Sequence, residues 1–176
     1  MGYTTVFRGH FSLSPALNPA QIAYLTHFAY IRHMIRDSTL CRAKPDPLRA
    51  AVNLDVGTDG EFFVAAEGDY GQGHDETIIE YNSQPKTQPS LWCQWVPTKD
   101  GTRIEWNRGE KFYCCEQWIE YMIANFLEPW GVKIEGKIEF AGEDPSDKGY
   151  LKIVDGHKCD RVFDASIDSK EVWASW

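Results

Sequence analysis

Residues 91–106 read LWCQWVPTKDGTRIEW, and this stretch organises the predicted fold. Two apolar runs, residues 91–97 and 102–106, flank the tetrapeptide Thr98-Lys99-Asp100-Gly101. An Asp-Gly pair between such runs is a strong hairpin signal, because the tight turns that suit twisted strands need positive φ angles. We therefore predict a central β-hairpin that carries Trp92, Trp95 and Trp106.

An amphipathic helix is predicted on each side of this hairpin. Over residues 19–35, Asn18 can cap the helix, Pro19 suits its first turn, and Gln21 completes a capping box. The second helix is expected over residues 114–127, where Cys115, Ile119, Met122 and Phe126 recur at helical spacing before Pro129 and Gly131.

Further strands are expected toward both ends of the chain. Residues 3–13 alternate with a period of two, residues 62–65 form a short apolar run, and residues 134–140 and 150–154 read as a second hairpin. Helices that alternate with antiparallel strand pairs indicate the α+β class. The prediction is one antiparallel sheet of five or six strands with the two main helices packed on one face; a ferredoxin-like order is one topology that fits.

The chain has 176 residues, a length typical of one domain, so residues 1–176 are predicted to form a single domain. Residues 66–90 are rich in Gly, Pro and acidic residues and are expected to be a long polar loop, which in compact domains is often functional. Residues 164–176 are expected to be either a short docking helix or a loose tail.

Charge and cysteine content restrict the classes of function. The formal charge is −8, from 26 acidic and 18 basic residues, which argues against direct binding to the polyanionic nucleic acids. Five cysteines, an odd number, fit reduced thiols in a cytoplasm better than a secreted disulfide framework. The N-terminus lacks the pattern of a secretory signal, and no apolar run approaches the roughly 20 residues of a membrane helix.

The candidate ligand site lies on and beside the central hairpin. An antiparallel sheet covered on one side leaves its other face open, where tryptophans could stack a planar ring and an arginine could bind a phosphate. The alternative is that these rings seal the core. The candidate ligand-binding residues are Trp92, Gln94, Trp95, Trp106, Asn107, Arg108 and Tyr113.

Other motifs give weaker indications of chemistry. Gly68–Gly73 has neither the spacing of a dinucleotide fingerprint nor the lysine of a phosphate loop. The five histidines and five cysteines show no metal-ligand spacing, so neither a metal nor a cofactor is predicted. His74 beside Asp75 and Glu76 could act as a general base, and Cys114 at a helix start could be reactive.

Several segments resemble a group of uncharacterised proteins from phages, prophages and bacteria. The resemblance covers the opening GYTT and residues 90–155, through the motifs WCQWVP, IEWNRGEKF, QWIEYMI, FLEPWG and IEGKIEFAGED. No activity is established for that group, so the resemblance implies a phage setting and, by analogy of setting alone, an accessory or anti-defence role.

Three functions follow as hypotheses. The first is a non-catalytic binding protein that holds a nucleotide-like small molecule, with residues 67–82 as a gate. The alternative is an acidic, DNA-mimic-like inhibitor that binds a host protein. The third is a small hydrolase that uses His74; it ranks last because no nucleophile, base and orienting group occur together, and a protein that is not an enzyme is favoured.

Overall fold

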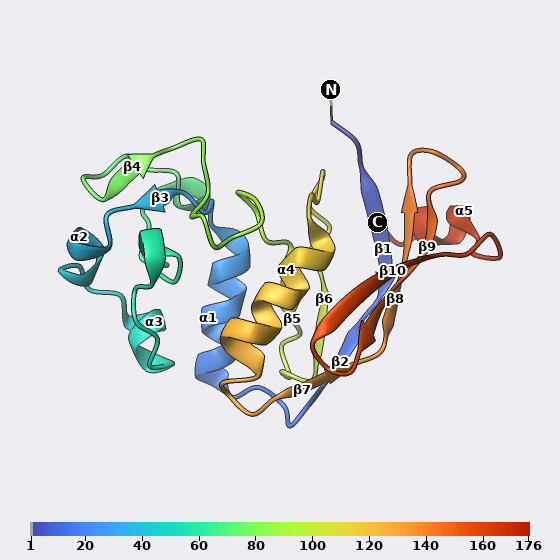
Figure 1. Ribbon diagram of the computed structural model, residues 1–176, viewed down its shortest axis with the longest axis horizontal. Coiled ribbons are helices and arrows are strands. Elements are labelled where there is room, and N and C mark those ends of the chain that lie inside the picture. The colour runs from blue at the N-terminus through green and yellow to red at the C-terminus, as the bar shows by residue number, and fades with distance from the viewer. Residues whose placement is uncertain (1) are drawn as a thin grey trace. The chain divides into compact units, whose positions relative to one another are not determined.

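The computed structural model describes residues 2–176 (Figure 1). These residues form two compact units. Unit 1 is built from residues 2–17 and 94–176, and unit 2 from Asn18–Cys93. Unit 2 is thus one continuous stretch, whereas unit 1 brings together two segments that are far apart in the sequence.

Unit 1 contains two four-stranded antiparallel sheets. The first has the order β1-β8-β9-β10, with strands Thr5–Gly9, Lys137–Gly142, Lys148–Val154 and Lys158–Phe163. The second has the order β5-β6-β2-β7, with strands Trp95–Pro97, Arg103–Trp106, Phe11–Ser14 and Lys133–Glu135. β5 and β6 form the predicted central hairpin, although β5 begins only at Trp95.

A single bent ribbon joins the two sheets. β1 pairs with β8 and β2 pairs with β7, and the register that matches Gly9 with Ile138 continues unchanged to Ser12 and Glu135. Where the ribbon leaves one sheet for the other, Gly9 and Gly136 have φ angles of 109° and 110°. Glycine adopts such angles without steric cost, so the two glycines allow both strands to bend at the same level.

The prediction of one sheet with two helices on one face is wrong. The described residues form three antiparallel sheets, of four, four and two strands, and five α-helices. The alternation over residues 3–13 continues through the bend at Gly9, so it does not show where one strand ends and the next begins. Residues 62–65 lie in no strand, although Phe63 and Val64 are buried as an apolar run should be.

Two helices belong to unit 1. α4 spans Cys115–Met122 and continues as the π-helical turn η3, Ile123–Leu127, close to the predicted helix. It packs against β10 and β5, and its fully buried side chains are Trp118, Ile119 and Met122. α5, Ser169–Ala174, is capped by Asp168 and packs on β1 and β8, so the end of the chain is a docked helix.

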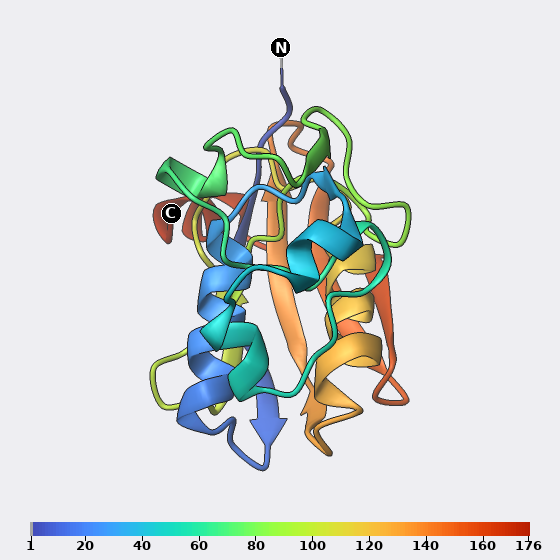
Figure 2. The same ribbon diagram turned by 90° about the vertical axis from the view of Figure 1, so that its left-hand side faces the viewer.

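Unit 2 is built around α1, Pro19–Tyr30, with the predicted capping box of Asn18 and Gln21 at its start. The helix ends at Tyr30 rather than at residue 35, because Ile31 turns to an extended conformation. α3, Pro47–Ala51, lies beside α1 (Figure 2). The remaining elements are α2, β3, η1, η2 and β4, which span Ser38–Arg42, Ile35–Arg36, Thr58–Gly60, Asp69–Gly71 and Ile78–Glu80.

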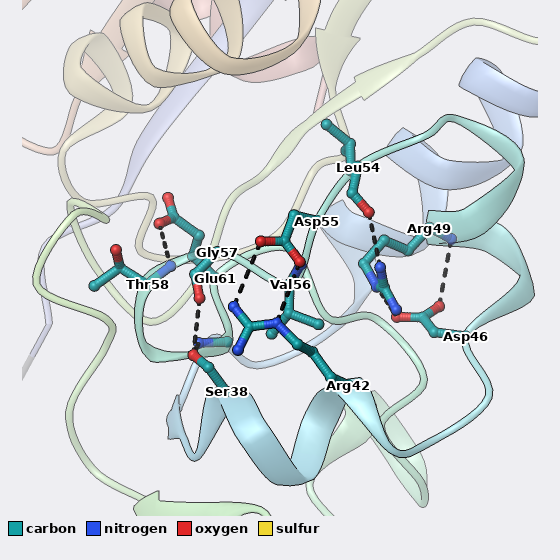
Figure 3. A network of polar contacts seen from close by, with 11 residues as sticks. Ser38, Arg42, Asp46, Arg49, Leu54, Asp55, Val56, Gly57, Thr58 and Glu61 are labelled. Atoms are coloured by element: carbon teal, nitrogen blue, oxygen red, sulfur yellow. Dashed lines mark hydrogen bonds and ion pairs between the residues drawn. The ribbon is translucent and has the colours of Figure 1, made fainter.

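Polar side chains hold the irregular part of unit 2 in place (Figure 3). The buried Asp46 carboxylate caps α3 by accepting from the Arg49 N–H at 3.4 Å and also accepts from the Val64 N–H at 2.9 Å. Arg49 donates to the Leu54 carbonyl at 2.7 Å. Ser38 donates to the Gly57 carbonyl at 2.8 Å and accepts from the Gly60 N–H at 3.2 Å.

The segment predicted as a long polar loop, residues 66–90, contains η2 and β4 and is anchored by Arg36. The buried Arg36 guanidinium donates to Thr77 Oγ1 at 2.6 Å and to Asp75 Oδ2 at 3.2 Å. It also lies 5.4 Å from the ring centre of Phe63. A charge buried this deeply needs such partners, which fix the segment to the strand β3.

Among the described residues, no helix combines the length and apolarity needed to cross a membrane.

Candidate functional site

The connection between β6 and α4, residues 107–114, has an unusual backbone. Arg108, Lys111 and Cys114 have φ angles of 65°, 57° and 57°, in the left-handed region that side chains other than Gly, Asn and Asp rarely adopt. Each such residue costs on the order of 1–3 kcal/mol, and strain of this kind concentrates at functional sites. The connection is therefore the first place to look for a site in unit 1.

A hollow of about 620 Å³ opens beside this connection, and we call it the Arg108 hollow. Its volume lies in the range of small-molecule sites, roughly 300–1,000 Å³. The residues that give it chemical character are Arg8, His10, Glu105, Trp106, Asn107 and Arg108. They come from β1, from the bend between β1 and β2, and from the end of β6, so the bent ribbon builds one wall.

Arg8 is held in place by two carboxylates. Its guanidinium contacts Glu139 Oε2 at 2.6 Å and Glu171 Oε2 at 2.9 Å, which come from β8 and α5. Hydrogen bonds to Glu171 and Glu139 raise the pKa of Arg8 above its ordinary value, so it stays charged. The arginine is oriented, and most of its charge is already compensated.

Arg108 and His10 are not compensated in this way. Among residues 2–176, neither the Arg108 guanidinium nor the His10 ring has an ion-pair or hydrogen-bond partner. The Arg108 side chain is exposed, and its carbonyl accepts from Trp176 Nε1 at 3.0 Å. A free guanidinium on a fixed backbone can form charge-assisted hydrogen bonds with phosphate or carboxylate oxygens.

Trp106 forms an aromatic edge of the Arg108 hollow. Its indole N–H donates to Gln94 Oε1 at 2.9 Å, and its ring meets Phe7 edge to face at 5.5 Å between centroids. Trp176, which is 47% exposed, stacks on Trp106 at 6.4 Å and 29°. Trp106 itself is only 7% exposed, and Trp176, which is not among the residues lining the hollow, presents more exposed ring surface.

Of the seven predicted site residues, the structure brings Trp106, Asn107 and Arg108 together in the Arg108 hollow. Gln94 and Trp95 lie behind it in the core, where Gln94 donates to the Glu110 carbonyl at 2.7 Å and Trp95 donates to the Cys115 carbonyl at 2.8 Å. Their role is to position β5 and the connection to α4.

The other two predicted residues lie elsewhere. Tyr113 is 51% exposed and does not line the Arg108 hollow. Trp92 belongs to unit 2, where it contacts Tyr70 and Arg32. The sequence pattern placed Trp92 on the hairpin, but the strand begins three residues later.

Sequence reasoning missed Arg8, His10 and Trp176. Arg8 and His10 lie on the same face of the alternating residues 3–13. That shared face is the feature of the sequence from which the pair could have been predicted. Trp173 lies in α5 and Trp176 two residues after the helix ends, and their ring centroids are 5.7 Å apart. Neither the alternation in residues 3–13 nor the spacing of the two tryptophans indicates that these two parts of the chain lie near each other.

The remaining catalytic candidates are not assembled into a reactive group. The His74 ring stacks on Tyr81 at 5.2 Å, while the Asp75 carboxylate is engaged by Arg36 and Thr77. Cys114, the thiol predicted to be reactive, is exposed at the N-cap of α4, where its side chain makes no cap hydrogen bond; its neighbour Cys115 is buried, and desolvation raises the pKa of that thiol. Over residues 2–176, no three His, Cys, Asp or Glu side chains are grouped so that they could hold a metal ion.

Comparison of the chain with known proteins adds no family. No protein-family profile, no curated protein and no solved structure matches it.

Proposed function

We propose that the protein is a non-catalytic binding protein and that the Arg108 hollow holds an anionic small molecule with a planar ring, of the nucleotide class. The observation that carries the proposal is the unpaired guanidinium of Arg108 beside Arg8, His10 and Trp106, on which Trp176 stacks. Among residues 2–176, the Arg108 guanidinium has no carboxylate partner although the net charge of the chain is −8, whereas Arg8 is paired with Glu139 and Glu171.

The mode of binding follows from the residue types. The free guanidinium and the His10 ring would meet the anionic group, and Trp176, which does not line the hollow but stacks on Trp106 at its edge, would offer its exposed surface to the planar ring of the ligand. Asn107 lines the same hollow, but its Oδ1 already accepts from the Gly109 N–H at 2.9 Å, which leaves its amide NH₂ to donate.

The setting is part of the same proposal. All five cysteines are free thiols, which fits a reducing cytoplasm. The phage setting implied by the sequence resemblance would make the protein an accessory factor that sequesters a nucleotide.

The test is a thermal-shift titration with mono-, di- and cyclic nucleotides and with the matching nucleosides, which lack phosphate. A ligand that binds only the folded state stabilises it by about 2.7 kcal/mol at 100 times its dissociation constant. We expect a nucleotide, and no nucleoside, to raise the melting temperature.

Arg108→Gln keeps the size of the side chain and removes its charge, so it should weaken nucleotide binding by roughly tenfold to a hundredfold, the value of a charge-assisted hydrogen bond. The matched control is Arg103→Gln, on the same strand, β6, and outside the Arg108 hollow. Equal weakening in both variants, or no shift with any anion in the panel, would contradict the proposal.

A further inference from the structure

Unit 2 carries two groups of aromatic contacts, which together we call the aromatic row: one joins His27, Tyr30, Tyr70 and Trp92, and the other joins Tyr81 and His74. Tyr30, the last residue of α1, stacks on Tyr70 at 5.0 Å and 29°. Tyr70 meets Trp92 edge to face at 6.0 Å. The row therefore draws residues from α1, from η2, from the chain directly after β4 and from the end of unit 2.

Arg32 joins the two halves of the row. Its guanidinium carbon lies 5.8 Å from the Trp92 ring centre and 4.7 Å from that of Tyr81. The same side chain donates to the Tyr81 carbonyl at 3.1 Å and to Asn82 Oδ1 at 3.2 Å. A cation over these rings is a stabilising contact, and it holds the rings in fixed places.

Tyr70 occupies a backbone position that does not suit it. Its φ angle is 56°, and a bulky residue there is a genuine outlier. Gly68 and Gly71 lie close on either side and also have positive φ angles. Glycine adopts such angles without steric strain, so the turn uses glycine at these two positions and a tyrosine at position 70. A strained tyrosine at the tip of a turn points to a role for its ring.

The stacked pair is about half exposed. Tyr70 is 52% exposed and Tyr30 is 45% exposed, so the stacked pair presents open aromatic surface. A single exposed tyrosine is ordinary, but contiguous exposed aromatic surface marks a candidate binding surface.

The charges around the pair are of both signs: Arg32, whose backbone N–H donates to the Tyr70 carbonyl at 2.8 Å, supplies a cation over Tyr81 and Trp92, and the segment that carries Tyr70 supplies acidic residues. Residues 67–80 contain five acidic residues and no lysine or arginine. Asp75 is paired with Arg36, and Glu76 with Lys44 at 3.4 Å. Among the described residues, Glu67, Asp69 and Glu80 have no ion-pair partner, and all three are exposed. Electron-rich ring faces flanked by free carboxylates attract cations and repel anions.

We propose that the aromatic row, centred on Tyr30 and Tyr70, docks a lysine- or arginine-rich peptide segment of a partner protein. Aliphatic stems of such side chains would lie on the rings, and the charged ends would meet Glu67 and Asp69. This surface is separate from the Arg108 hollow, and its chemistry is the opposite, since it takes cations where the hollow takes anions.

The experiment is an NMR or calorimetric titration of the full chain with hexalysine and hexaarginine, compared with hexaglutamate and a neutral Gly-Ser hexamer. We expect the two cationic peptides alone to bind, and their affinity to fall as salt screens the carboxylates. Binding of the anionic or neutral peptide, or no binding of either cationic peptide, would overturn the proposal.

Two variants at one position separate binding from folding. Tyr70→Asn removes the ring but suits the left-handed backbone, so the protein should fold normally and lose about 5-fold to 30-fold in affinity, the range of cation–π contacts. Tyr70→Phe keeps both the ring and the strain and should bind like the native chain. Equal binding by Tyr70→Asn and the native protein would overturn the proposal.

A charge variant tests the acidic flank. Asp69→Asn keeps the shape of the side chain and should weaken the cationic peptides, with less effect at high salt. Nucleotide binding at the Arg108 hollow should be the same in Tyr70→Asn, Asp69→Asn and the native chain. Failure of the peptide titration would therefore leave the proposed nucleotide function standing, and failure of the nucleotide titration would leave this one standing.

Discussion

At the scale of single residues, burial decides which polar groups act as ligands and which act as structure. Gln94 looked like a ligand contact beside the tryptophans, but its side-chain amide joins Trp106 Nε1 to the Glu110 carbonyl inside unit 1. Trp95 is fully buried with its N–H paired to the Cys115 carbonyl. Arg108, thirteen residues after Trp95, keeps an unpaired charge in solvent. An unpaired charge is available to a ligand, whereas a satisfied buried group is not.

His33 gives the protein a defined dependence on pH. Burial lowers the pKa of His33 to about 3, with a smaller contribution from the Arg36 charge, while the ring Nε2 lies 2.9 Å from the Phe28 carbonyl. The unfolded chain has a histidine pKa of about 6.5, so between these two values the unfolded state binds one more proton than the folded state. Stability is therefore full above about pH 6.5 and is lost as the pH falls toward 3, by about 1.4 kcal/mol per pH unit.

Urea unfolding at pH 8 and pH 5 checks this prediction. The native chain should lose about 2 kcal/mol more between these two pH values than His33→Gln, whose amide can donate to the same carbonyl without titrating. His157→Gln, at an exposed histidine, should follow the native chain. If His33→Gln shows the native pH dependence, His33 is not the group that titrates.

At the scale of elements, short helices depend on their caps. α3 has five residues and no buried side chain of its own, so neither its length nor its packing makes it stable. Asp46 supplies what is missing: it caps the helix, pairs with Arg49 at 3.3 Å, and binds the Val64 N–H. The cap therefore ties a local helix to a segment eighteen residues later.

Asp46→Ala should destabilise the protein by about 3 kcal/mol, because it removes a cap and leaves Arg49 and the Val64 N–H without their partner. Denaturant unfolding followed by circular dichroism measures the loss. The matched control is Asp55→Ala, which breaks the exposed pair with Arg42 at 3.4 Å and should cost much less. Equal losses would show that burial of Asp46 does not set its contribution.

At the scale of the whole molecule, the acidic charge is shared evenly. Unit 2 has ten acidic and six basic residues, and unit 1 has sixteen and twelve, so each has a formal charge of −4. Neither unit is a basic module hidden in an acidic chain. The Arg108 hollow is a local exception to this acidic surface. Its volume is large enough for a small anion, but its few basic side chains do not attract a polyanion over a long distance.

The protein should therefore not bind a duplex DNA of arbitrary sequence. Fluorescence anisotropy with a labelled duplex should show no binding at physiological salt up to roughly 100 μM, the weak end of ordinary non-specific affinities. Lowering the salt should not produce binding, because both partners carry net negative charge. An affinity that rises steeply as salt is lowered would reveal a basic surface and contradict this expectation.

The sequence by itself determined the local features of this protein. The capping box at Asn18 and Gln21, the turn at Asp100-Gly101 and the helical row from Cys115 to Phe126 all appear in the structure, since each depends on residues that are near neighbours in the chain. The same locality let the sequence place Trp106, Asn107 and Arg108 side by side, because they are consecutive.

Only the tertiary structure decided how these pieces meet. The division of the strands into separate sheets depends on the bends at Gly9 and Gly136, more than a hundred residues apart, and alternation continues through such a bend unchanged. Arg8 reaches the Arg108 hollow, and Tyr70 stacks on Tyr30, through long-range packing. Periodicity reports which side of an element is apolar; it carries no information about which distant element will cover that side.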